Sequence, residues 1–174
     1  TIPGFSHHDA GDLPSWDGDG YHIRLIAGCL DGKEAPVKTY SPMFYADARL
    51  NAGASVTLPP EHEERAVHVA EGTIEIVGER FEVGQTVVLT PGSNVTVTAM
   101  DGSRVMLLGG APLDTAPDAR PNQPRHMYWN FVSHSRERIE QAKDDWINGR
   151  FPAVPGEALF SLFVALFLQG LLCM

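Results

Sequence analysis

Cysteine and runs of basic residues are scarce in this sequence. Its 174 residues include two cysteines, Cys29 and Cys173, and no CxxC pair, which excludes a disulfide framework and favours a reducing compartment. We therefore expect a cytoplasmic location, or a nuclear one if the source is eukaryotic. Thirteen basic and 22 acidic residues give a formal net charge of −9, and no run of Lys or Arg occurs. Direct nucleic-acid binding is disfavoured, while a protein partner that associates with DNA stays open.

Long apolar runs are absent except at the end of the chain. Residues 158–174 form a stretch of 17 residues without a charged side chain, which is at the lower limit for crossing a bilayer. Three interpretations are open: a membrane anchor, a helix that covers a hydrophobic surface, or the product of an altered reading frame or splice. We favour the last, and we expect no other membrane contact. The rest of the chain is long enough for the core of one domain.

Short alternating segments separated by Gly, Pro and Asp dominate residues 21–110. Strands of about five residues with a turn every ten or so favour a sandwich or barrel over βαβ units. The run Thr86–Leu89 is apolar after its first residue and predicts a more buried strand. The other predicted strands are Tyr21–Ile26, Met43–Leu50, Arg65–Val69, Thr73–Val77 and Asn94–Thr98.

A proline-rich loop at residues 111–124 precedes the one predicted helix, over 135–148. Ser133 or Ser135 can act as its N-cap and Gly149 can end it. Three aromatic residues of this part could form a ligand platform, but packing of the helix against the barrel is the better interpretation. They are Trp129, Phe131 and Trp146, of which Trp146 shares a helix face with Ile139 and Ala142.

Two glycine-framed spacings resemble the two motifs of the cupin superfamily. In the first, Gly53 is followed at fixed intervals by Pro59, Glu61, Arg65 and Gly72. In the second, Gly84 is followed by Thr90-Pro91-Gly92 and then Val95. The resemblance implies an all-β cupin double-stranded β-helix, a jelly-roll barrel, with one C-terminal α-helix.

The four positions that normally ligate a metal in cupins lack suitable donors here. Pro59, Glu61 and Arg65 stand where His, His and Glu are usual, and Val95 stands where the last His belongs. A ferrous site needs about three or four N or O donors, so we predict no metal, no cofactor-binding residue and no catalytic residue in this chain. Arg65 and the nearby Glu61, Glu63 and Glu64 are interpreted as a solvated charged rim. The alternative is a relocated metal site made by His62, Glu64 and His68, which share one side of an extended strand.

Longer matches resemble one cupin family, the pirins, over roughly residues 5–157. Its C-terminal domain is similar to the segments Thr39–Leu50, Val67–Gly72 and Leu107–Leu113. The most specific matches are Tyr128–Val132, Ser135–Ala142, Asp145-Trp146, Gly149–Pro152 and Val154–Gly156. Phe5–His8 and Leu13-Pro14 resemble the linker between the two pirin domains. We therefore expect an interdomain linker or arm over 1–20, the cupin domain over 21–157 and an atypical tail over 158–174.

The resemblance implies a supporting role rather than catalysis. Pirins are bicupins in which the N-terminal domain holds Fe(II) and the C-terminal domain is metal-free; they are quercetinase-like dioxygenases or redox-sensing regulators. We expect a fragment that begins at Thr1, whose partner is the N-terminal cupin domain of the same parent, with a further protein partner open. This chain alone is not expected to be an enzyme, although its parent could be an iron-dependent dioxygenase.

One rival interpretation keeps the chain an enzyme. Sugar-nucleotide epimerases of the cupin superfamily work without metal, with a His base and a Tyr acid inside the barrel. Here His68 would act with Tyr45 or Tyr40 in a stand-alone cupin of the epimerase or isomerase type.

Overall fold

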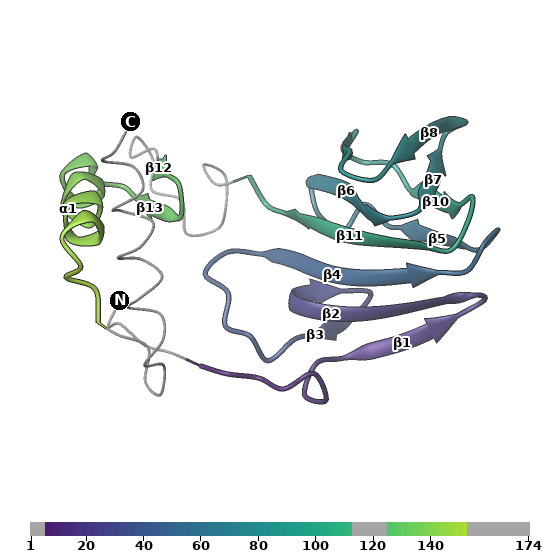
Figure 1. Cartoon of the computed structure of the whole chain (residues 1–174), viewed down its shortest axis with the longest axis horizontal. Helices are drawn as coiled ribbons and strands as arrows, with labels where there is room; N and C mark the ends of the chain where they lie inside the picture. The colour runs from purple at the N-terminus through teal and green to yellow at the C-terminus, as the bar shows by residue number, and fades with distance from the viewer. Residues whose placement is uncertain (1–5, 113–124, 153–174) are drawn as a thin grey trace, which may run out of the picture. The chain divides into compact units, whose positions relative to one another are not determined.

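The computed structural model describes residues 6–112 and 125–152 of the chain (Figure 1). These residues fall into two compact units, with the division between Gln123 and Pro124. The first unit holds eleven strands and the second a two-stranded hairpin and a helix. We describe each unit by itself.

The first unit consists of antiparallel strands that form two sheets. The larger sheet has the order β1-β2-β4-β11-β6-β9, with β3 paired to β2, and the smaller has the order β5-β10-β7-β8. The strands are β1 Ser15–Gly18, β2 Tyr21–Leu30, β3 Lys33–Glu34, β4 Met43–Leu50, β5 Ser55–Leu58, β6 Glu64–Glu71, β7 Thr73–Ile76, β8 Glu79–Glu82, β9 Thr86–Leu89, β10 Val95–Ala99 and β11 Ser103–Gly110.

The two sheets share one hydrophobic core, because every second side chain of their strands faces it. Val67 and Val69 of β6 and Val105 and Leu107 of β11 are fully buried, while the residues between them lie on the outer face. Each such buried aliphatic side chain stabilises the fold by about 1.5–3 kcal/mol. The expected jelly-roll fold class is confirmed by this arrangement.

The predicted strands are all present. Two related predictions differ from the structure: the burial of one strand and the length of the N-terminal arm. Thr86–Leu89 is an edge strand rather than a buried one: Leu89 and Val87 face the core, but Val88 is 80% exposed. A continuous apolar run cannot distinguish a strand buried on both faces from an edge strand with one apolar outer residue. The expected arm over residues 1–20 is also shorter, because Ser15–Gly18 pairs with β2 and Trp16 packs against the core.

Gly28 occupies a place that other residues cannot. Its φ is +76°, and a Cβ atom there would lie 1.8 Å from the carbonyl oxygen of Met43. The pairing of β2 with β4 shifts register just before it, between Leu25 and Ala27. A β-bulge followed by this glycine therefore lets the two strands stay in close contact past the irregularity.

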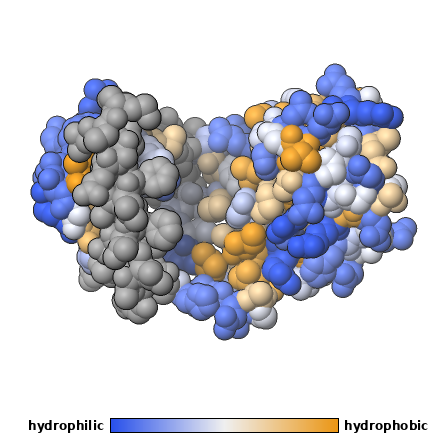
Figure 2. Space-filling model, in the orientation of Figure 1, coloured by the Kyte–Doolittle hydropathy of each residue, from blue (hydrophilic) through white to orange (hydrophobic). Residues whose placement is uncertain are grey.

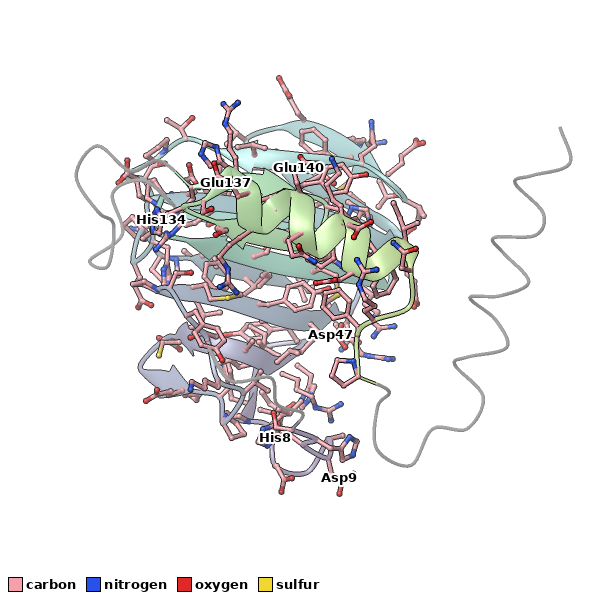
Figure 3. All side chains as sticks on the ribbon, turned by 90° about the vertical axis from the view of Figure 1, so that its left-hand side faces the viewer. His8, Asp9, Asp47, His134, Glu137 and Glu140 are labelled. Carbon is pink, nitrogen blue, oxygen red and sulfur yellow. The ribbon has the colours of Figure 1, made fainter. Side chains whose placement is uncertain are left out.

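The second unit contains β12 (His126–Tyr128), β13 (Phe131–Ser133) and α1 (Arg136–Ile147). The helix begins and ends as predicted. The Ser135 hydroxyl is the N-cap and accepts a hydrogen bond from the Arg138 N–H at 3.2 Å, while Gly149 follows the helix with φ +62°. That hydroxyl also donates to the Glu137 carboxylate (2.6 Å), and this bond lowers the pKa of Glu137, which Figure 3 shows at the start of the helix.

The aromatic residues of this unit pack on one another. The Trp146 ring lies 5.1 Å from that of Trp129 and 5.9 Å from that of Phe151, and Phe131 stacks on Phe151. The sequence predicts a buried Trp146, but its exposed fraction is 41%, and the buried residue of α1 is Ile139. Edge contacts between large rings leave much of each ring uncovered, which explains the difference. Packing of α1 against the jelly roll stays a prediction.

Residues 113–124 and 153–174, which include the apolar tail, lie outside the described residues. No helix in the ranges 6–112 and 125–152 has the length and hydropathy to cross a membrane.

The hairpin between β7 and β8 yields a stability prediction. Ile76 pairs with Glu79, so Val77 and Gly78 form a two-residue loop, and both have positive φ (+52° and +79°). A β-branched residue is strained in this conformation, whereas asparagine tolerates it. Val77→Asn should therefore raise the free energy of unfolding by about 1 kcal/mol, seen as a higher melting temperature.

Val83→Asn is the matched control, because Val83 is also exposed (61%) but has no positive φ. A gain of the same size at Val83 would mean that surface hydrophobicity, not backbone strain, controls the effect.

Candidate functional site

The four motif positions lie in very different surroundings. Pro59 follows β5, and Val95 opens β10 with an exposed fraction of 8%, among the core residues. Glu61 is exposed, and its carboxylate accepts a hydrogen bond from the backbone N–H of Asp31 at 3.2 Å. Arg65 on β6 is 2% exposed. The four residues therefore do not face a common open space.

These residues do not fit a metal ion. Proline and valine side chains carry no donor atom, and the guanidinium of Arg65 is a cation without a free lone pair. One exposed carboxylate is left, which is well short of the three or four donors that a ferrous ion needs.

Arg65 itself corrects the sequence interpretation of a solvated rim. Glu63 and Glu64 are exposed as expected, but Arg65 faces the core with Val67 and Val69. Its Nη1 donates to the carbonyl oxygens of Leu58 (3.1 Å) and Pro59 (3.0 Å), and its Nη2 donates to that of Thr90 (3.0 Å). The sequence does indicate this burial, because Arg65 is two and four residues from Val67 and Val69, and alternate residues of a strand face the same side.

The alternative metal site is not assembled. The His62 ring contacts the carbonyl oxygen of Cys29 (3.1 Å) and lies 5.0 Å from the ring of Phe44. The His68 ring instead contacts the hydroxyl of Thr86, on β9, at 2.8 Å. Within the ranges that the structure describes, no three His, Cys, Asp or Glu side chains gather closely enough to hold an ion.

The His and Tyr pair of the epimerase-type alternative lies on the wrong side of the sheet. Val67 and Val69 face the core, so His68 between them faces outward, and Tyr45 faces outward between the buried Phe44 and Ala46. Tyr40 precedes β4 and is 66% exposed. An acid and a base inside the jelly roll are therefore not provided by these residues.

The space left between the sheets is small. A cavity of ≈ 190 Å³ opens where Pro59 stands, and its lining is mixed, with apolar side chains beside the polar Asp31 and Thr57. Its lining includes Trp16, Tyr21, Leu30, Val56, Leu58 and Pro59. Ligand pockets for drug-sized molecules span about 300–1,000 Å³, so this space is too small for a flavonol-sized substrate.

A larger apolar surface lies on the outer face of the seven-stranded sheet. Tyr45, Leu108, Ala66 and Val88 are directly opposite one another across β4, β11, β6 and β9, and we call them the outer apolar row. They line a groove of ≈ 590 Å³ together with residues such as Met43 and Pro91. Figure 2 shows hydrophobic residues, in orange, grouped on the surface of the jelly-roll unit. The sequence analysis missed this row, because the side chains meet only across strands.

Further along the same face the surface becomes charged. Arg104 of β11 donates to both carboxylate oxygens of Asp47 on β4, from Nε at 2.8 Å and from Nη2 at 3.0 Å. These hydrogen bonds, and then the charge of Asp47, raise the pKa of Arg104 further. Asp47, labelled in Figure 3, is also directly opposite Arg24 of β2. The fork-shaped contact makes this part of the face polar. The groove at the outer apolar row is itself lined by Glu63 and Glu64 as well as by apolar residues.

Two antiparallel sheets over one core, with the two glycine-framed motifs at their turns, define a cupin. Residues 45–152 match the family described as "Pirin C-terminal cupin domain", and the chain belongs to the pirin family. It is 42% identical to a pirin-like protein of Caulobacter vibrioides over 149 residues, which is 85% of this chain and 49% of that relative.

Other relatives carry a dioxygenase name. The chain is 37% identical to a putative quercetin 2,3-dioxygenase of Pseudomonas aeruginosa, over 84% of this chain and 44% of the relative. A crystal structure of quercetin 2,3-dioxygenase from Acinetobacter baumannii is similar with a TM-score of 0.64 at 30% identity, over 83% of this chain and 49% of that chain. The chain thus spans about half the length of the curated relatives it matches.

The motif position Val95 gives a prediction. A histidine there would place a polar ring among the core residues next to Leu58, which pairs with Val95 across β5 and β10. We expect Val95→His to lower the free energy of unfolding by about 2–4 kcal/mol, measured by denaturant unfolding, and to add no metal affinity.

The control is Asn94→His, one residue earlier at an exposed position, where the cost should stay within about 0.5 kcal/mol. If Val95→His is as stable as the control, the interior has room for the ligand that the motif has lost.

Proposed function

We propose that this chain is the metal-free C-terminal cupin half of a pirin-like protein and supports a separate cupin half that holds iron. The observation that carries the proposal is the replacement of the acidic ligand by a buried arginine, whose guanidinium already has three acceptors. The match to the C-terminal pirin domain and the twofold greater length of the relatives support it.

Oxygen chemistry then belongs to the other half. The relatives named as quercetin 2,3-dioxygenases point to a flavonol-type substrate for the whole protein. Bound Fe(II) in the N-terminal half would supply the activation of dioxygen. This half would contribute the wall of the groove between the two cupins and a face for protein contact, in the cytoplasm.

Metal content tests the first part of the proposal. Because the motif positions lack donors, the purified chain should hold well under one iron, zinc, copper or manganese ion, and it should show no oxygen uptake with quercetin. Elemental analysis and an oxygen electrode measure the two quantities.

About one tightly held ion per chain, lost in both His62→Ala and His68→Ala, would contradict the metal-free assignment. Oxygen uptake that survives removal of contaminating metal would contradict the supporting role.

The outer apolar row is the described surface best suited to contact another protein part. Val88, at the β9 end of the row, is 80% exposed, and the row continues across four neighbouring strands without a charged side chain. Flat apolar surfaces of this kind are typical of protein interfaces. We assign it to the contact with the iron-bearing half.

A binding experiment tests this assignment. The probe is the part of the Caulobacter vibrioides pirin-like protein that this chain leaves uncovered, titrated with the full chain by calorimetry. Val88→Lys should weaken the complex about tenfold or more, because a charge would be buried in the contact.

Val77→Lys is the matched control, since Val77 is a valine of similar exposure (90%) on the hairpin of the smaller sheet. It should leave the affinity unchanged. Equal effects of the two variants would exclude the outer apolar row, and absence of any complex would contradict the supporting role itself.

A further inference from the structure

Arg65 is the only charged side chain in the buried class within the ranges 6–112 and 125–152. Its exposed fraction is 2%, and the hydrogen bonds of its Nη1 and Nη2 go to backbone carbonyl oxygens rather than to a carboxylate. A guanidinium stays charged in proteins, and moving a charge from water into the interior costs free energy unless a partner stabilises it there. Such a group persists only if its surroundings stabilise the cation, so the acceptors around Arg65 need an explanation.

The acceptors come from the ends of strands in both sheets. Leu58 is the last residue of β5 in the smaller sheet, and Pro59 follows it; Thr90 follows β9 in the larger sheet. Arg65 itself is on β6, directly opposite Leu89 of β9 and Gly109 of β11. One planar group therefore ties the ends of β5 and β9 to β6, across the gap between the two sheets.

The carbonyl oxygens around Arg65 form the kind of site that binds a cation. Three carbonyl oxygens at 3.0–3.1 Å converge on the positive group: that of Leu58, the last residue of β5, and those of Pro59 and Thr90, which directly follow β5 and β9. Carbonyl oxygens are hard ligands that also coordinate metal cations. An arginine can bind them from two nitrogens at once in a fixed fork, which a lysine cannot do.

We propose that Arg65 is the resident cation of this cupin motif. It stands at the position of the acidic ligand in metal-binding cupins, and its guanidinium holds together the strand ends that a metal ion and its ligands would otherwise link. The domain thus folds around the positive charge of Arg65, and this charge repels a divalent ion from the same position. This inference starts from the same buried Arg65 that carries the proposed function, but its test measures unfolding rather than metal content or binding, so the two can fail separately.

The test compares Arg65→Met and Arg65→Lys in the full chain by thermal unfolding in chelator-treated buffer. Methionine fills similar space without charge or donors, so the three carbonyls lose their partner, and the melting temperature should fall by roughly 5–15 °C. Lysine keeps the charge and should lose clearly less. Arg80→Met, at an exposed arginine of β8, is the control and should change little.

An Arg65→Met variant as stable as the unaltered chain, or as stable as Arg65→Lys, would overturn the proposal, because Arg65 would then only fill space. If neither variant folds, Arg65→Ala is refolded with millimolar methylguanidinium and, in parallel, with methylammonium. Recovery of the β-sheet circular dichroism signal with methylguanidinium alone supports a guanidinium site. No difference between the two additives overturns it.

Discussion

The alternation of side chains along β6 is the constraint on which the rest of the structure depends. Arg65, Val67 and Val69 face the core, and Ala66 and His68 face outward. Because a β-strand has a period of two, no residue of this strand can exchange faces without a shift of its whole register. The same constraint buries the arginine, keeps His68 out of the interior and places Ala66 in the outer apolar row.

Burial of a guanidinium and capture of a metal ion exclude each other at this place. A divalent ion needs an anionic or neutral donor where Arg65 stands, and the positive charge of Arg65 would repel it. The core around it is closed further by Val95, which is 8% exposed, and the remaining cavity is ≈ 190 Å³. On the proposal that Arg65 is the resident cation, the stability of this region and the exclusion of a metal ion have the same structural origin.

Much of the fold could be predicted from sequence, because alternation and glycine turns act locally. Met43–Leu50 was predicted with the bounds that the structure gives, and Ser135 was one of two predicted N-caps. Properties that depend on partners across strands could not be predicted: Val88 is exposed because β9 is an edge, and Trp146 is half-exposed because it packs edge-on. Arg65 was misassigned to a solvated rim because its three glutamate neighbours suggested water, whereas its parity with Val67 and Val69 indicated the core.

The glycine frame of the motifs survives without the ligands because the two serve different physical requirements. Gly53, Gly72, Gly84 and Gly92 all have φ between +76° and +87°, so each marks a turn that most side chains would strain. These turns hold the strand order of both sheets whatever the intervening side chains are. A cupin domain that keeps these turns retains its fold even where other side chains stand at the ligand positions, as Pro59, Arg65 and Val95 do here. The persistence of a cupin frame in a sequence is therefore a statement about folding, and metal chemistry has to be argued from the donor atoms alone.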